Sequence, residues 1–84
     1  DGAIDALIAG LQFGKPQTQA LASQLIVSTG ERGILIALSH EDPAVRAWAI
    51  HQGVRSPNIR ERIIELLNGD PDPQVREAAR GWLQ

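Results

Sequence analysis

The pattern Asp-Pro-x-Val-Arg-x-x-Ala occurs twice in this sequence, in EDPAVRAWAI (residues 41–50) and in PDPQVREAAR (residues 71–80). The two prolines, Pro43 and Pro73, are 30 residues apart, and Pro16 lies 27 residues before Pro43. Self-similarity at a period of about 20 to 50 residues is typical of repeat architectures, in which each unit buries its apolar face against its neighbours. This repetition constrains the fold more than any other feature of the chain.

Each of the three prolines begins a segment with the periodicity of an amphipathic helix. Counted from the proline, places two, five, six, nine and ten lie on one side of a helix, and places one, four and eight lie opposite. The first side is mainly apolar in all three segments: Thr18, Leu21, Ala22, Leu25 and Ile26; Val45, Trp48, Ala49, Gln52 and Gly53; Val75, Ala78, Ala79, Trp82 and Leu83. The pattern therefore predicts three helices in the same phase.

The residues around these prolines are suited to starting a helix. Proline is tolerated at the first helical position, where its missing N–H leaves no hydrogen bond unmade. Asp42 and Asp72 precede two of the prolines and can accept hydrogen bonds from the free N–H groups of the first turn. Lys15 cannot do this, so we expect the first of the three helices to have a weaker start.

A second amphipathic segment precedes each of these helices, over residues 3–13, 32–40 and 57–69. Gly14, Gly30 and Gly69 are natural helix stops, and Ser56 before a proline is a natural cap. No segment shows the sustained alternation of a strand. The sequence thus predicts one all-α domain, residues 1–84, with six helices in three hairpins and repeats at approximately 1–29, 30–55 and 56–84.

Composition argues against several classes of partner. Ten acidic and eight basic residues give a net charge of −2 without a basic stripe, so we expect no nucleic-acid partner. No apolar run approaches the ~20 residues of a membrane helix, so we expect no membrane partner. The absence of cysteine excludes disulfides and thiolate metal sites and leaves the compartment open. The start at Asp1 rather than Met suggests a piece of a longer protein.

The segments LLNGDPDPQVREAARGWL (66–83) and LSHEDPAVRAWAI (38–50) resemble HEAT repeats, especially the short type called phycobilisome-lyase HEAT-like. LQFGKPQTQALAS (11–23) is similar in its proline and apolar spacing. The resemblance implies a right-handed α-solenoid of antiparallel helix hairpins, in which the second helix of each pair usually lines the concave side. It is specific for the fold and unspecific for function, because the family contains many scaffolds.

The resemblance also implies structural roles between repeats. In the family, the first Asp and the Arg of D-P-D-P-x-V-R typically bond between neighbouring repeats, and Asp70 and Arg76 match that pair. The middle copy has Arg46, with His40 in place of the Asp. The implied structural residues are Asp42, Arg46, Asp70, Asp72 and Arg76.

Three interpretations of the sequence as an enzyme find little support. HEAT-like hydroxylases bind iron through recurring His-Glu pairs, whereas this chain has one such pair, His40-Glu41, with His51 as the only other imidazole. A metal needs several converging ligands, so we predict no metal and no cofactor. HEAT-like DNA glycosylases use a basic concave face, which this chain lacks. No serine lies in a glycine-flanked nucleophile elbow.

The two tryptophans call for separate interpretations. Trp48, where the other copies have Leu21 and Ala78, is interpreted as a residue of the core or its edge, with ligand stacking as the alternative. Trp82 and Leu83 would face a further hairpin. Either the first helix of the third pair covers them or they leave an open apolar face, and we favour the open face. That face would serve self-association or neighbouring repeats.

The function predicted from the sequence is a non-catalytic module that binds or scaffolds another protein. Its surface would be the outward row of the second helices: Gln17, Ala20, Gln24, Ala44, Ala47, His51, Gln74 and Glu77. The alternative is a part of a HEAT-like enzyme, a lyase or hydroxylase acting on a protein, whose catalytic residues lie outside this chain.

Overall fold

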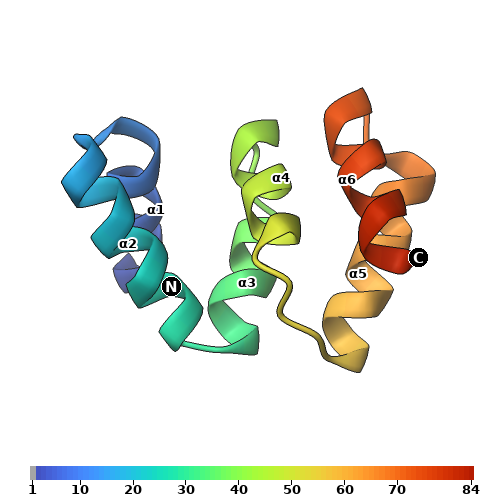
Figure 1. Ribbon diagram of the computed structural model, residues 1–84, viewed down its shortest axis with the longest axis horizontal. Helices are drawn as coiled ribbons and strands as arrows, with labels where there is room; N and C mark the ends of the chain where they lie inside the picture. The colour runs from blue at the N-terminus through green and yellow to red at the C-terminus, as the bar shows by residue number, and fades with distance from the viewer. Residues whose placement is uncertain (1) are drawn as a thin grey trace.

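The chain forms six α-helices and no strand in residues 2–84, which are the residues that the computed structural model describes (Figure 1). The predicted start of the first repeat at Asp1 lies outside them. The helices are α1 (Gly2–Phe13), α2 (Pro16–Ser28), α3 (Glu31–Leu38), α4 (Pro43–His51), α5 (Pro57–Gly69) and α6 (Pro73–Leu83). The predictions of an all-α chain and of six helices are therefore confirmed.

The predicted capping residues begin the helices. Asp42 Oδ1 accepts a hydrogen bond from the Ala44 N–H at 2.9 Å, and Asp72 Oδ1 accepts from the N–H of Gln74 at 2.8 Å. Ser56 caps α5 in the same way, and Lys15 makes no side-chain cap for α2. These interactions satisfy donors that the first helical turn leaves unpaired, so the sequence sets each helix start locally.

The helix ends differ partly from the prediction. Gly30 follows the C-cap of α2 with φ of 72°, in the left-handed region that favours glycine, as predicted for a stop. α5 also ends at Gly69, as predicted, although Gly69 has no positive φ and Asp70 is the C-cap. α3 ends at Leu38, two residues earlier than predicted, since the His40 N–H turns back to the Ala37 carbonyl.

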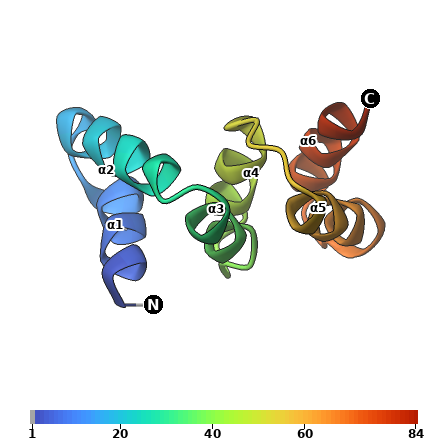
Figure 2. The same ribbon diagram turned by 90° about the horizontal axis from the view of Figure 1, so that it is seen from below.

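Consecutive helices pack as pairs, α1 on α2, α3 on α4 and α5 on α6, and the pairs follow one another in a row (Figures 1 and 2). The second and third hairpins pack along both helices, α3 against α5 and α4 against α6. The first hairpin meets the second mainly through α3, which packs on α1 and α2. Thr29 and Gly30 alone join α2 to α3, at a bend of 117°, whereas residues 52–56 join α4 to α5. The two junctions between hairpins are therefore different.

A contiguous apolar core runs through all three hairpins. Its largest fully buried side chains are Ile8, Ile26, Ile34, Leu38, Ile59, Ile63 and Val75. Places two and six of the repeat contribute Val45, Val75 and the buried alanines Ala22, Ala49 and Ala79. Place five is different: Leu21 is 57% exposed, and Trp48 and Ala78 are half-buried. The apolar side predicted for α2 is thus only partly covered.

An ion pair between Arg46 and Asp70 joins the second and third hairpins. Nε and Nη2 of Arg46 donate to Oδ2 and Oδ1 of Asp70 at 2.7 and 3.0 Å. The two side chains are 11% and 2% exposed. Nη1 of Arg46 donates to the carbonyl oxygens of His40 and Glu41 at 2.8 and 2.9 Å, so the buried guanidinium is held from both sides.

Asp70 is charged despite its burial. Burial raises the pKa of this carboxyl, but hydrogen bonds from Arg46 and from the Asp72 N–H outweigh it, and the pKa lies below its ordinary value. Arg76 donates to the backbone carbonyl of Asp70 at 2.6 Å and not to its carboxylate. The Asp70 carboxylate bonds instead to Arg46, across the two hairpins. In the middle copy, His40 Nδ1 accepts from the Asp42 N–H at 3.0 Å, as Asp70 Oδ1 does from Asp72.

Candidate functional site

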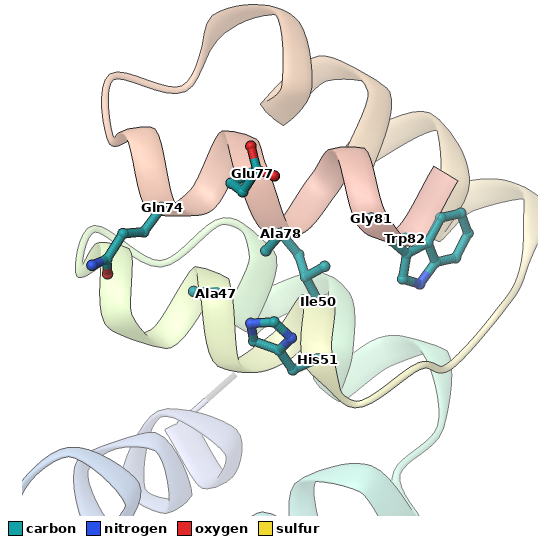
Figure 3. Close-up of a pocket in the computed structure, with 8 residues that line it drawn as sticks. All are labelled: Ala47, Ile50, His51, Gln74, Glu77, Ala78, Gly81 and Trp82. Carbon is teal, nitrogen blue, oxygen red and sulfur yellow. The ribbon is translucent and has the colours of Figure 1, made fainter. Parts of the chain in front are cut away.

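A groove of about 550 Å³ lies between α4 and α6 (Figure 3). Its lining residues come from the second helices of two successive hairpins. They are Ala47, Ile50 and His51 from α4, and Gln74, Glu77, Ala78, Gly81 and Trp82 from α6. We call this feature the α4–α6 groove. It exists because two second helices, both anchored on their own first helices, pack side by side.

The floor of the groove is apolar and made of small side chains. Ile50 from α4 and Ala78 from α6 lie between the two helices (Figure 3). Ala47 and Gly81 leave room above them, and a Cβ added at Gly81 would meet nothing within 4 Å. A floor of this kind can receive apolar side chains of a ligand without exposing unpaired polar groups.

Polar side chains form the rim. His51 stands on the α4 side, and Gln74 and Glu77 stand on the α6 side (Figure 3). All three are exposed, and Glu77 also pairs with Arg80 at 3.2 Å on the outer surface. An apolar floor bordered by hydrogen-bonding groups can hold a ligand that is partly apolar and partly polar, because the floor removes apolar groups from water and the rim orients them.

The structure brings together only some of the residues predicted for binding. Ala47, His51, Gln74 and Glu77 share the α4–α6 groove. Ala44 lines a different cleft, at the junction of the first and second hairpins. Gln17, Ala20 and Gln24 are exposed on α2 and line neither of these two cavities. The row is interrupted because α2 does not pack along α4 as α4 packs along α6.

Four lining residues were not predicted: Ile50, Ala78, Gly81 and Trp82. Gly81 is at place eight from Pro73, on the outward side of its helix, but it is not part of the predicted row. Ile50 is at place seven from its proline, where α6 has Arg80, so the repeat pattern gives no apolar signal there. Only the packing of α4 on α6 shows that Ile50 faces a neighbour.

The expectation of an open face at Trp82 is wrong for the tryptophan itself. Trp82 is 7% exposed and belongs to the core. The guanidinium carbon of Arg55 lies 4.2 Å from its ring centroid, and Arg55 Nη1 donates to the Trp82 carbonyl at 3.2 Å. The α4–α5 linker thus covers the ring through a cation–π contact. The large hydrophobic side chains that are exposed include Phe13, Leu21, Leu25 and Ile64.

The side chains that could ligate a metal are dispersed. No group of three or more His, Cys, Asp or Glu residues converges anywhere in residues 2–84. His40, the first residue of the His-Glu pair, uses Nδ1 to accept from the Asp42 N–H and so belongs to the turn before α4. In the same residues, no single helix is long and apolar enough to cross a membrane, although α2 and α3 reach that length and hydropathy as a pair bent by 117°.

Comparison with protein-family models, with curated proteins and with solved structures found no match to this chain.

Proposed function

We propose that this chain is a non-catalytic protein-binding or scaffolding module, built from HEAT-like repeats that stack as a right-handed solenoid. The observation that carries the proposal is the α4–α6 groove, whose apolar floor and polar rim are supplied by equivalent helices of successive repeats. Support for the fold comes from the three hairpins in a row and from the Arg46–Asp70 pair between two of them.

The groove is built on rigid elements, which suits recognition of a preformed shape. α4 is fixed by the Asp42 cap and α6 by the Asp72 cap, and the ion pair between Arg46 and Asp70 holds the two repeats in register. Little order is then lost on binding, so a modest contact area can give useful affinity. The occupant that fits is a short amphipathic segment of another protein, with apolar side chains over Ile50 and Ala78 and polar groups at the rim.

The test is selection of short amphipathic peptides on immobilised protein, followed by measurement of their affinity for variants. Gly81→Leu should place an apolar side chain in the groove, and its first atom is accommodated, since a Cβ there meets nothing within 4 Å. Gly69→Leu is the matched control, because Gly69 is also helical with open space around it and lies outside the groove. Selected peptides should lose at least about tenfold in affinity, or ~1.4 kcal/mol, for Gly81→Leu alone. Failure to select any peptide, or equal binding by both variants, would contradict the proposal.

A further inference from the structure

A second cleft, of about 290 Å³, lies at the junction of the first and second hairpins. Its apolar walls are Leu11 from α1 and Val45 and Trp48 from α4. Its polar lining includes Gln12, Gln19 and Asp42. We call this the inter-hairpin cleft. It arises where α2 and α4 do not pack along each other as α4 and α6 do.

Trp48 is the residue that distinguishes this junction. The equivalent places hold Leu21 in α2 and Ala78 in α6. Trp48 packs against the core and is half-buried, so part of its side chain remains available to the cleft. An aromatic side chain that is neither fully buried nor freely exposed offers a π surface at which a ligand can be partly desolvated.

The cleft carries a negative charge that no cation in its lining neutralises. Hydrogen bonds from the Gln12 side chain and from the Ala44 N–H lower the pKa of Asp42, with smaller contributions from His40 and Arg46. Among residues 2–84, no Lys, Arg or His lines the cleft. Arg46 directs its N–H groups to Asp70 and to the carbonyls of the preceding turn. The donors on Asp42 are therefore an amide and a backbone N–H, both neutral.

We propose that the inter-hairpin cleft binds the guanidinium group of an arginine side chain from a partner protein. The observations behind the proposal are a half-buried tryptophan and an aspartate whose carboxylate accepts from a neutral amide, in one cleft whose described lining has no cationic side chain. A guanidinium is weakly hydrated, stacks on aromatic surfaces and donates several hydrogen bonds in one plane, to which the Asp42 carboxylate and the Gln19 amide oxygen are suited acceptors. The inference does not depend on the α4–α6 groove and can hold if that groove binds nothing.

The first test is an NMR titration of the ¹⁵N-labelled chain with N-acetyl-arginine methylamide. The citrulline analogue is the neutral control and the lysine analogue is the cationic control. Both have a side chain of about the same length as arginine. We expect saturable shifts of the Trp48 indole N–H and of the Gln12 and Gln19 side-chain amides, with the Trp82 indole N–H unmoved. The citrulline analogue should bind at least about tenfold more weakly. Equal shifts with citrulline, or shifts without saturation, would overturn the proposal, and equal binding of lysine would overturn the preference for guanidinium.

The second test uses substitutions that retain the fold. Asp42→Asn removes the charge and one acceptor oxygen, to which Gln12 donates, and keeps an N-cap acceptor for α4, because Asn caps helices about as well as Asp. Asp72→Asn is the control, since Asp72 likewise accepts from the N–H two residues on at the start of its helix and does not line the cleft. Arginine binding should fall about tenfold in Asp42→Asn and stay unchanged in Asp72→Asn.

Trp48→Leu, which places the residue of the first copy at this position, should also weaken arginine binding about fivefold or more. Circular dichroism of each variant verifies the helical fold before titration. Binding that is undiminished in both Asp42→Asn and Trp48→Leu would assign the arginine to another place and overturn the inference.

Discussion

Replacement of Asp70 tests whether the ion pair between Arg46 and Asp70 holds the second and third hairpins together. In Asp70→Ala, Nε and Nη2 of Arg46 lose both carboxylate acceptors, and an arginine side chain that is only 11% exposed in the native chain keeps only the carbonyl acceptors of its Nη1. A buried charge left without its partner costs about 3–5 kcal/mol. The total free energy of unfolding expected for a chain of this length is about 4–12 kcal/mol. We therefore expect Asp70→Ala to lose a large fraction of its stability.

A double-mutant cycle separates the pair from its surroundings. Asp70 also accepts from the Asp72 N–H at 2.9 Å, so Asp70→Ala disturbs a turn as well as the pair. Asp70→Asn can keep that acceptor, but it removes the charge and also replaces the second carboxylate oxygen by an NH₂ group that faces Arg46 Nε. Both Asp70→Asn and Asp70→Ala are therefore combined with Arg46→Met in the cycle. The free energies of unfolding are measured by urea denaturation, followed by circular dichroism at 222 nm and by tryptophan fluorescence. We expect a coupling energy of about 2 kcal/mol or more between the two positions.

The exposed pair Arg80–Glu77 supplies the control. Its side chains are 62% and 72% exposed, and pairs of this kind contribute about 0–0.5 kcal/mol. A cycle on this pair should show almost no coupling. If the coupling between residues 46 and 70 were equally small, the argument that the buried pair holds the hairpins in register would be refuted.

Three further outcomes are expected. Asp72→Ala should lose about 1 kcal/mol of stability, because it removes the acceptor for the Gln74 and Val75 N–H groups at the start of α6; Asp72→Asn, measured in the same urea titration, should lose little. Because the pKa of Asp70 is lowered in the folded chain, the stability that this carboxylate contributes is complete above its ordinary pKa of 3.8 and is lost as the pH falls through the lower folded-state pKa. Urea titrations from pH 5 to pH 2 should therefore show a steeper loss of stability for the native chain than for Asp70→Asn. Gly30→Ala should destabilise by about 1 kcal/mol because of its φ of 72°, whereas Gly69→Ala, in the helical region with open space, should be neutral or stabilising in thermal denaturation.

Local sequence signals were sufficient for the helices but not for every helix end. Proline at the first helical position and an Asp or Ser before it act within one turn, so these starts could be predicted without tertiary information. The end of α3 could not, because the backbone N–H groups of Ser39 and His40 turn back three residues, to the carbonyls of Ile36 and Ala37. Neither residue is a helix-stop residue such as glycine or proline, so the sequence gives no signal for this end.

The candidate site was predicted only in part. The repeat pattern placed Ala47, His51, Gln74 and Glu77 on one side of their helices, and the structure gathers them in the α4–α6 groove. The same pattern assigned Gln17 and Gln24 to the binding surface as well, although they lie on α2, away from that groove. Periodicity describes each helix separately and contains no information on how closely two successive second helices approach.

The sequence by itself determined what short-range physics controls: six helices, their starts and the faces that carry apolar residues. Tertiary structure decided what depends on contacts between hairpins. The two-residue connection between α2 and α3 turns the first hairpin away from α4, which opens the inter-hairpin cleft beside Trp48. Arg55 covers Trp82, where the sequence had favoured an open face. Asp70 pairs with Arg46 across the hairpins, because a carboxylate buried at this junction is stable only where it meets a compensating charge.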